Sequence, residues 1–220
     1  ILYEDNHLMV VNKRISDIVQ GDQTGDVSLD RLLKDFIKKR DGKPGEVFLG
    51  IPHRLDRPVS GVVVFAKTSK ALSRMAVLFK EKKVKKIYHA IVEKSPGADQ
   101  GTLEHYLTRN TRQNKSYVHS HEVKDSKHAI LHYSKLAASD RYHLLEIELE
   151  TGRHHQIRAQ LAGIGCMIKG DRKYGAKRSN PNGGISLHAR SISFVHPVKK
   201  EAVEVVAPYP KMDIFPVFFR

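Results

Sequence analysis

The sequence predicts an α+β fold with a largely antiparallel sheet. Two segments, residues 86–93 and 143–150, have the two-residue period of a β-strand, and in the second the apolar Leu145, Ile147 and Leu149 alternate with glutamates. The spacing in residues 1–11 is typical of a hairpin, and helical periodicity is confined to a few separate segments. Strands and helices do not alternate regularly along the chain, so this pattern favours an α+β arrangement over a doubly wound parallel sheet.

Several elements are expected in the first third of the chain. Residues 1–11 hold two short β-prone runs around the turn pair Asp5-Asn6, which predicts a hairpin. Ser28 is a candidate N-cap for a helix that ends near Asp41, and Val27 with Leu32 would form a hydrophobic staple. The apolar stripe of this helix consists of Leu29, Leu32, Leu33, Phe36 and Ile37. Residues 62–65 are a short apolar run that predicts a buried strand.

The later elements follow from the same patterns. A helix is expected from Ser69, with one face made of Leu72, Met75, Ala76 and Phe79. Strands are expected over 86–93, 143–150, 191–195 and 202–206. The turn Thr151-Gly152 closes the second of these, and a helix of about ten residues should follow it. That helix would carry His154, His155, Gln156 and Arg158 in its first turns.

Composition indicates one basic domain over residues 1–220. The chain has 38 Lys+Arg against 24 Asp+Glu, a formal net charge of +14, and 40% hydrophobic residues, enough for a packed core. No repeat, low-complexity tract or long linker divides it. Excess positive charge attracts polyanions, so nucleic acid is the first candidate partner, although a generally basic protein would have the same charge.

Other classes of protein do not fit the sequence. No apolar stretch approaches the ~18 residues of a membrane span, and the start of the chain lacks the apolar core of a signal peptide. We therefore expect a cytoplasmic protein that does not bind membranes. Cys166 is the one cysteine, which excludes intramolecular disulfides and cysteine-rich zinc sites. Its simplest interpretation is a small core residue.

The segment His53 to Gly61 carries the most distinctive chemistry. It places Asp56 between Arg54 and Arg57, directly before the expected buried strand. Neighbouring guanidinium groups favour an ionised carboxylate, as a nucleophile or base requires. The alternative is a loop ion pair that only holds the turn together.

Two further segments are basic. Lysines 80, 82, 83, 85 and 86 lead into the strand that contains Tyr88, so they could contact phosphates, although such a run is often a solvated helix end. Tyr88 could present its ring and phenol to a ligand, or it could be a core residue. The segment Gly170 to Gly175 is a glycine-bounded turn with Arg172, which is consistent with simple turn chemistry or with an RNA contact.

The segment Thr151 to Arg158 gathers hydrogen-bond donors at the expected helix N-terminus, where the helix dipole favours anions. Adjacent histidines could suggest zinc. On a helix, however, His154 and His155 would diverge by about 100°, unlike the i, i+4 pair of a metalloprotease, so we expect no metal site. Phosphate-binding loops, dinucleotide-binding glycine motifs and serine-hydrolase elbows are also missing from the sequence.

Taken in order, these motifs resemble those of the RluA-type pseudouridine synthases. The matching segments are His53-Arg54-Leu55-Asp56-Arg57, Lys86-Ile87-Tyr88-His89-Ala90, Thr151 to Arg158, Gly170-Asp171 with Tyr174-Gly175, Leu187-His188-Ala189 and His196-Pro197. The opening residues 3–13 are similar as well, so the resemblance extends from the first residues to about Pro210. No RNA-binding S4 domain is visible.

The resemblance implies a fold and a reaction. The fold is the pseudouridine synthase catalytic fold, a mostly antiparallel mixed sheet in two subdomains that flank an RNA-binding cleft. The reaction isomerises uridine to pseudouridine within RNA, without cofactor or metal. Asp56 would be the catalytic aspartate. Tyr88 would stack on the target base and could accept the C5 proton, and Arg158 would pair with the catalytic carboxylate.

The implied partner is structured RNA, either rRNA or tRNA, bound by a monomer. The target uridine would be flipped out of its stack into the pocket. Residues expected to contact substrate or RNA are Arg54, Arg57, Lys86, Arg153, His155, Gln156, Arg172 and Leu187. The sequence does not identify the RNA, the position, the number of sites or the route by which Asp56 acts.

Two other functions remain open. The first is a noncatalytic RNA-binding or RNA-folding protein on the same scaffold. The second is a carboxylate-based glycosidase, which would need a paired acid and base where Asp56 has only arginines beside it. Arg14 and the pair Pro58-Val59 depart from residues common in the family, but neither departure falls on Asp56, Tyr88 or Arg158.

Overall fold

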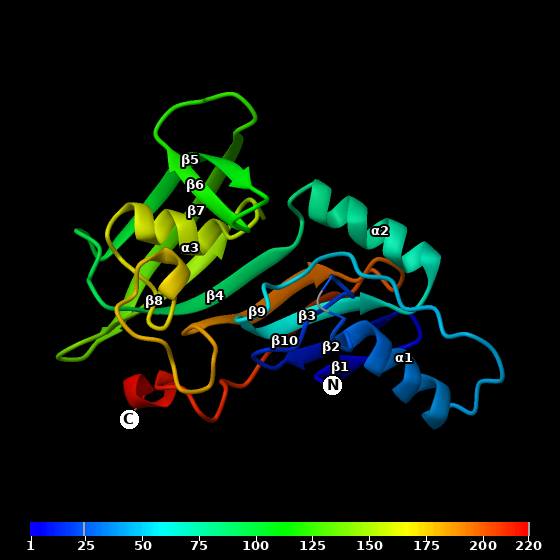
Figure 1. The fold of residues 1–220 in the computed structure, drawn as a ribbon. Helices are drawn as coiled ribbons and strands as arrows, with labels where there is room; N and C mark the ends of the chain where they lie inside the picture. Colours follow the sequence, from blue (N-terminus) through cyan, green and yellow to red (C-terminus); the bar gives the residue numbers. More distant parts are fainter. Residues whose placement is uncertain (24, 220) are drawn as a thin grey trace. The chain divides into compact units, whose positions relative to one another are not determined.

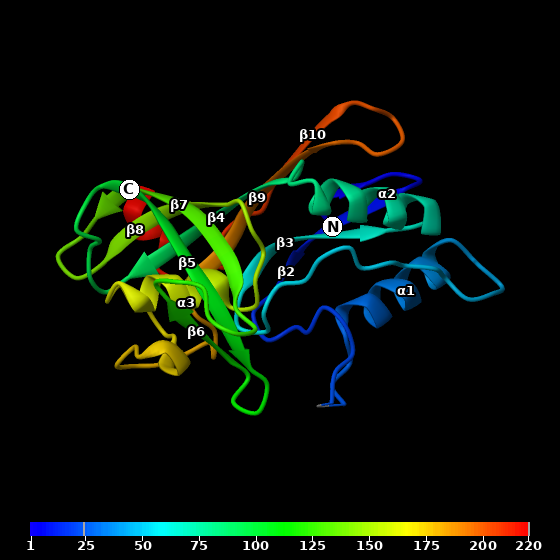
Figure 2. The same cartoon turned by 90° about the horizontal axis from the view of Figure 1, so that it is seen from above.

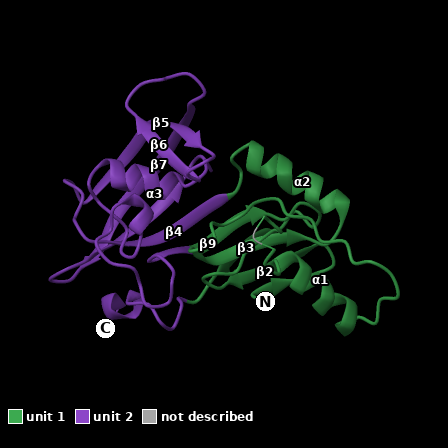
Figure 3. Cartoon of the chain, viewed as in Figure 1, with its two compact units in different colours: residues 1–84, 190–208 green, residues 85–189, 209–220 purple. Residues whose placement is uncertain are grey.

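The computed structural model describes residues 1–23 and 25–219 (Figure 1). The chain folds into two compact units (Figure 3). Unit 1 comprises residues 1–84 and 190–208, and unit 2 comprises residues 85–189 and 209–220. The family resemblance implied two subdomains, and the chain divides into the same number.

Unit 1 is built on a sheet with two helices. Its strands are β1 (Tyr3–Glu4), β2 (Leu8–Lys13), β3 (Ser60–Ala66), the part of β9 (Leu187–Val195) from residue 190 onward, and β10 (Ala202–Val206). β1 pairs with β2, β2 with β3, and β10 with β9, each time antiparallel. The predicted N-terminal hairpin and the strands at 62–65, 191–195 and 202–206 are therefore confirmed.

The helices of unit 1 cover β3, and every residue of that strand is buried. α2 (Ser69–Lys80) begins after Thr68, whose hydroxyl accepts a hydrogen bond from the backbone N–H of Ala71. Ala71 and Met75 pack into the core with Val10, Val62 and Val64. α1 (Leu29–Arg40) lies on the other side of β2 and β3 (Figure 2). Ala76 is exposed, so the predicted apolar face of α2 is displaced toward Ala71.

α1 has the predicted bounds but a narrower buried face than its sequence indicates. Leu33 and Ile37 are buried, whereas Leu32 and Phe36 are exposed. Val27 is 57% exposed, so the predicted staple with Leu32 is wrong. Ser28 stands at the N-cap with its hydroxyl bonded to Asp30 and not to a helix N–H. Because a helix of 12 residues meets the sheet along one line, only the central part of its stripe is covered.

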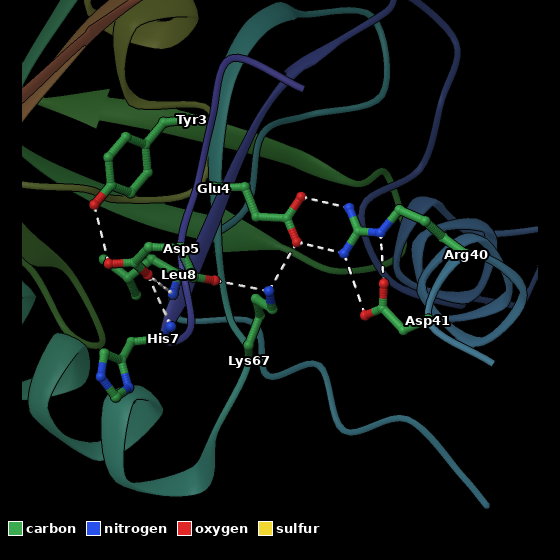
Figure 4. A network of polar contacts seen from close by, with 8 residues as sticks. All are labelled: Tyr3, Glu4, Asp5, His7, Leu8, Arg40, Asp41 and Lys67. Carbon is green, nitrogen blue, oxygen red and sulfur yellow. Dashed lines mark hydrogen bonds and ion pairs between the residues drawn. The ribbon is translucent and has the colours of Figure 1, made fainter. Parts of the chain in front are cut away.

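A polar network joins three elements of unit 1 (Figure 4). Glu4 of β1 accepts two hydrogen bonds from Arg40, at the C-terminus of α1, at 2.7 and 2.8 Å. The ammonium of Lys67, just after β3, lies 2.7 Å from the same carboxylate. Two cations hold the pKa of Glu4 at about 2, well below its usual 4.5, because their hydrogen bonds favour the ionised form.

The sheet of unit 2 contains more strands than the sequence patterns indicated. It begins with the part of β9 before residue 190 and continues through β4 (Lys85–Val92), β8 (His143–Leu149), β7 (Lys127–Ala138), β5 (Gln100–Asn110) and β6 (Lys115–His119). The pairs from β4 to β6 are antiparallel. The strands predicted at 86–93 and 143–150 are confirmed. No strand is predicted from the sequence at β5, β6 or β7, although Ala129, Leu131 and Tyr133 alternate as buried residues along β7.

One helix and a short turn complete the part of unit 2 that concerns the site. α3 (Gln156–Gly163) packs through Ala159 on Leu107 and Ala129 of the sheet. The 3₁₀ turn η1 (Arg172–Tyr174) follows later, and a second one, η2 (Phe215–Phe219), lies near the end of the chain. Within the residues that the structure describes, no helix is long and apolar enough to cross a membrane.

Candidate active site

Asp56 lies in a tight turn that leads into the buried strand β3. Its side chain is half-buried, and its carbonyl accepts a hydrogen bond from the N–H of Val59 at 3.0 Å. Leu55 and Val59, on either side, are buried in the core. The turn thus holds the carboxylate of Asp56 at the end of a rigid strand, where site residues are commonly displayed.

A buried lysine restrains this turn through hydrogen bonds to its backbone carbonyls. Lys13, at the end of β2, is 1% exposed, and its Nζ donates to the carbonyls of Arg14, Arg57 and Val59 at 2.9, 3.1 and 2.7 Å. Burial lowers the pKa of Lys13 to about 8, while the negative charges of Asp17 and Asp56 oppose that shift. The ammonium therefore connects two strands of the sheet and stiffens the backbone on the C-terminal side of Asp56.

Both arginines next to Asp56 are exposed and have partners elsewhere in unit 1. Arg54 donates from Nη1 to the side-chain oxygen of Gln20 at 3.2 Å. Arg57 forms an ion pair with Asp26 at 2.7 Å. Each of these arginines therefore also ties the Asp56 turn to the segment before α1.

In unit 2, β4 supplies Tyr88 and Lys86. Tyr88 is buried and stands opposite Ile147 of β8 in the strand register. The Nζ atom of Lys86 is 3.8 Å from the point that a Cβ at Gly152 would occupy. Lys86 and the turn before α3 are therefore neighbours, as their joint candidacy for an RNA-binding surface requires.

Arg158, in the first turns of α3, forms a buried bidentate ion pair with Asp171. Its Nε and Nη2 atoms donate to the two carboxylate oxygens at 2.7 and 2.9 Å. The side chains of Arg158 and Asp171 are 5% and 1% exposed. The ring of Tyr174 lies 5.1 Å from the centre of the guanidinium group. Arg158 is thus fixed within unit 2 by residues of the Gly170–Gly175 segment.

Gln156 organises the turn that precedes α3. Its Oε1 accepts hydrogen bonds from the Thr151 hydroxyl at 2.8 Å and from the N–H of Arg153 at 3.0 Å. Its amide nitrogen donates to the carbonyl of Ile130 at 3.0 Å. Arg153 also donates from Nε to the carbonyl of His128 at 2.8 Å. The donors that the sequence placed at the helix N-terminus therefore join the turn to strand β7.

The two adjacent histidines lie before α3 and not within it. His155 has a left-handed backbone with φ of 53°, and its ring stacks on that of His154 with 3.8 Å between centroids. The prediction that the two rings diverge on a helix is therefore wrong, because the helix begins at Gln156. Nδ1 of His155 lies 3.0 Å from the hydroxyl of Tyr174. Burial and the nearby charge of Arg158 lower the pKa of His155 to about 2, so its ring is neutral at physiological pH.

The candidate RNA contacts differ in exposure. Arg54, Arg57, Arg153 and Arg172 are exposed, and Lys86 is half-buried. His155, Gln156 and Leu187 are buried. Arg172 also donates to the carbonyl of Lys177. RNA contact by these residues remains a prediction.

The expected catalytic residues come from different units. Asp56 belongs to unit 1, whereas Tyr88 and Arg158 belong to unit 2. The expected pairing of Arg158 with Asp56 therefore stays a prediction. Among residues 1–23 and 25–219, no group of three or more His, Cys, Asp or Glu side chains could hold a metal ion. Cys166 is buried and has a free thiol.

Sequence reasoning missed the supporting role of two residues. Lys13 ends an apolar strand, and nothing in its local pattern distinguishes a buried ammonium from an exposed one. Asp171 lies in the glycine-bounded segment 170–175, but an arginine partner 13 positions away has no local signature. The closely spaced glycines around Asp171 were the available signal.

The chain is similar in sequence to known proteins. A family model described as RNA pseudouridylate synthase matches residues 7–163. A Synechocystis protein named as an uncharacterized RNA pseudouridine synthase is 35% identical over 213 residues, which cover 96% of this chain and 65% of the relative. Ribosomal large subunit pseudouridine synthase D of Zymomonas mobilis is 31% identical over 223 residues, 96% of this chain and 69% of the relative. The chain thus spans about two thirds of the length of these relatives.

Solved structures show the same fold. Human RNA pseudouridylate synthase domain containing 4 aligns with a TM-score of 0.80 at 24% identity, covering 96% of this chain and 88% of the human one. Human RNA pseudouridylate synthase domain containing 1 aligns with a TM-score of 0.76 at 26% identity, covering 95% and 82%. The predicted fold class, α+β with a mostly antiparallel sheet, is confirmed.

Proposed function

Because the chain belongs to the RNA pseudouridylate synthase family, we propose that it isomerises uridine to pseudouridine within structured RNA. Asp56 is the catalytic carboxylate, Tyr88 acts at the uracil ring, and Arg158 pairs with Asp56. Modification takes place on rRNA or tRNA in the cytoplasm, by a monomer. The name of the Zymomonas relative refers to the large ribosomal subunit, which makes rRNA the first substrate to examine.

The reaction sets clear requirements for these residues. The N1–C1′ bond of uridine breaks, the uracil turns, and a C5–C1′ bond forms while C5 loses a proton and N1 gains one. The atoms balance without an oxidant or a second substrate. A carboxylate must act at the ribose, either by attack on C1′ or by removal of a ribose proton, and both routes need its ionised form. A base must then accept the C5 proton, and the phenol oxygen of Tyr88 is the candidate.

The observation that carries the proposal is the anchoring of the Asp56 turn. A carboxylate can work at C1′ only if its position relative to the sugar is maintained to within about an ångström. Two of the hydrogen bonds from buried Lys13, to the carbonyls of Arg57 and Val59, restrain the turn of Asp56 in the way that this requires. A loop ion pair that only joined two surface segments would need no buried ammonium beneath it.

Binding of the RNA relies on the exposed basic side chains. Arg54, Arg57, Arg153 and Arg172 supply guanidinium groups suited to phosphate oxygens. Tyr88 would replace the stacking that the flipped uridine loses. Pocket residues select uracil, whereas the fold of the RNA decides which uridine enters.

Pseudouridine mapping tests the proposal. RNA from the source organism without this gene should lack pseudouridine at one or a few positions of rRNA or tRNA. Re-expression of the wild-type gene should restore them, and Asp56→Asn should not. Asp35→Asn provides a matched control, because Asp35 is an exposed carboxylate in α1 of the same unit. It should restore every position.

Two outcomes would contradict the proposal. If no position changes on deletion, the chain does not modify these RNAs. If Asp56→Asn restores every position, Asp56 is not the catalytic carboxylate. Retained RNA binding together with no dependence on Asp56 would favour the noncatalytic RNA-binding protein.

A further inference from the structure

The Gly170–Gly175 segment contacts Arg158 from two directions. Asp171 meets the edge of the guanidinium group with both carboxylate oxygens, at 2.7 and 2.9 Å. Tyr174 lies beside the same group, with its ring centroid 5.1 Å from the guanidinium carbon. A bidentate contact fixes the plane of a guanidinium group as well as its position, which a single hydrogen bond cannot do.

The backbone of the segment is itself restrained. The carbonyl of Asp171 accepts hydrogen bonds from the N–H groups of Tyr174 and Ala176 at 3.0 and 3.1 Å, and its own N–H donates to Ile168 at 3.0 Å. Gly170 has φ of +88°, and a Cβ there would lie 2.7 Å from the side chain of Asn180. The carboxylate of Asp171 is therefore carried by a backbone with little freedom to move.

Tyr174 is held equally firmly. Its hydroxyl accepts a hydrogen bond from the N–H of Ser116 in β6 at 2.8 Å and lies 3.0 Å from Nδ1 of His155. The phenol thus joins a sheet strand to the turn before α3. Its ring cannot turn away from Arg158 without breaking these contacts.

We propose that Asp171 is a positioning residue that sets the direction of the Arg158 guanidinium for the catalytic carboxylate, with Tyr174 supporting the same group through its ring. The inference rests on the proposed function. A guanidinium has five N–H donors, and Arg158 donates to Asp171 from Nε and Nη2. The group can therefore bind a second carboxylate as well as Asp171. Asp171 would also balance the buried positive charge of Arg158.

This role differs from general stabilisation. Removing one member of a buried ion pair lowers the free energy of unfolding, because it leaves a buried charge uncompensated. The geometric effect of Asp171 is therefore measured as kcat at a temperature at which the variant is folded. Loss of Asp171 should therefore reduce the rate of the chemical step more than the affinity for RNA.

Steady-state kinetics on the RNA identified by mapping tests the inference. Asp171→Asn keeps the shape of the side chain and removes its charge and its second acceptor oxygen. We expect kcat to fall about 10- to 100-fold and KM for RNA to change less than about threefold. If Asp171→Asn fails to fold, Asp171→Glu keeps the ion pair but displaces the carboxylate, and it should show the same separation of kcat from KM.

A double-mutant cycle separates positioning from structure. The Arg158→Gln variant has no guanidinium for Asp171 to position. Adding Asp171→Asn to that variant should therefore lower kcat by a further factor of less than about two. A matched control is Asp213→Asn in unit 2. The carboxylate of Asp213 accepts hydrogen bonds from the Ser186 hydroxyl and from the N–H of Ile214, and neither partner is an arginine. This variant should change the melting temperature and leave kcat unchanged.

Three results would overturn the inference. Asp171→Asn could retain kcat within about twofold of wild type. Asp171→Asn could lower kcat by the same factor in the Arg158→Gln background as in the wild type, which would indicate that Asp171 acts independently of Arg158. The decrease in kcat of Asp171→Asn could also equal the fraction of that variant that is unfolded at the assay temperature, as measured by thermal melts. An inactive wild-type protein would instead refute the proposed function, and with it the role of Asp171.

Discussion

Lys13 lies in an environment that its chemistry does not favour. Lysine is rarely buried, because removing an ammonium from water is costly. Here three carbonyls replace the lost water, and two of them belong to the turn that contains Asp56. The same burial that restrains the turn also makes this lysine easier to deprotonate.

The pKa of Lys13 leads to a testable pH dependence. Its value of about 8 in the folded protein lies below the usual 10.5, so between these two pH values the unfolded chain holds more protons. The free energy of unfolding should therefore gain a contribution from Lys13 as the pH rises through that window. NMR titration of the Lys13 side chain should give a midpoint near 8.

The control for this titration is the protein in urea, where the midpoint of Lys13 should move toward 10.5. A midpoint near 10.5 in the folded protein would mean that the ammonium is not buried as described. Activity should also decline above pH 8, because a neutral amine has two N–H donors for three carbonyls.

At the scale of elements, contacts between strands and helices depend on a few charged residues. Glu4 of β1 holds the C-terminus of α1 through Arg40 and the end of β3 through Lys67. Its pKa of about 2 is lower than the usual 4.5, so the stability that it contributes is complete above pH 4.5 and is lost as the pH falls toward 2.

Acid unfolding of Glu4→Gln tests this contribution. The variant should be less stable than wild type near neutral pH, and the difference should shrink as the pH drops from 4.5 to 2. Glu46→Gln is the matched control, since Glu46 is 96% exposed and pairs only loosely with Lys38 at 3.3 Å. An equal pH response in both variants would contradict the role of Glu4.

The Gly170–Gly175 segment offers a second prediction at this scale. Gly170→Ala should lower stability by about 2–4 kcal/mol, because it adds a steric clash to an unfavourable φ. Gly165→Ala is the control: φ there is +78°, but a Cβ would meet nothing within 4 Å. Thermal melts should rank Gly170→Ala well below Gly165→Ala, and an equal loss would show that Asn180 moves aside easily.

Elements were predictable where the periodicity was strong. The bounds of α1, β4 and β8 follow from apolar spacing, and the structure confirms them. The start of α3 did not follow, because the left-handed backbone of His155 ends the preceding turn one residue before the helix. In that conformation His155 contacts Tyr174, which lies 19 positions further along the chain and outside any local pattern.

At the scale of the whole molecule, the net charge of +14 governs encounters with RNA. Each phosphate neutralised by Lys or Arg releases counterions, so affinity should fall steeply with salt. With about five basic contacts, the logarithm of the affinity should decrease by roughly 3–5 per tenfold increase in salt concentration. Filter binding at several salt concentrations measures this slope.

A single substitution sharpens this test. Arg153→Gln should reduce the slope by about 1 if Arg153 contacts a phosphate. Arg31→Gln, on the exposed face of α1, removes the same charge from a residue outside the candidate set and should leave the slope unchanged. A flat response of the wild-type protein to salt would contradict RNA binding through basic side chains.

The sequence by itself determined the fold class, the order of most elements, the basic character and the family. These properties depend on local periodicity, composition and short motifs, which can be recognised in the sequence without knowledge of the folded structure. Only the tertiary structure decided that Lys13 is buried beneath the Asp56 turn and that Asp171 holds Arg158. The two contacts join residues 46 and 13 positions apart, and their energy depends on burial, which exists only after the chain has folded.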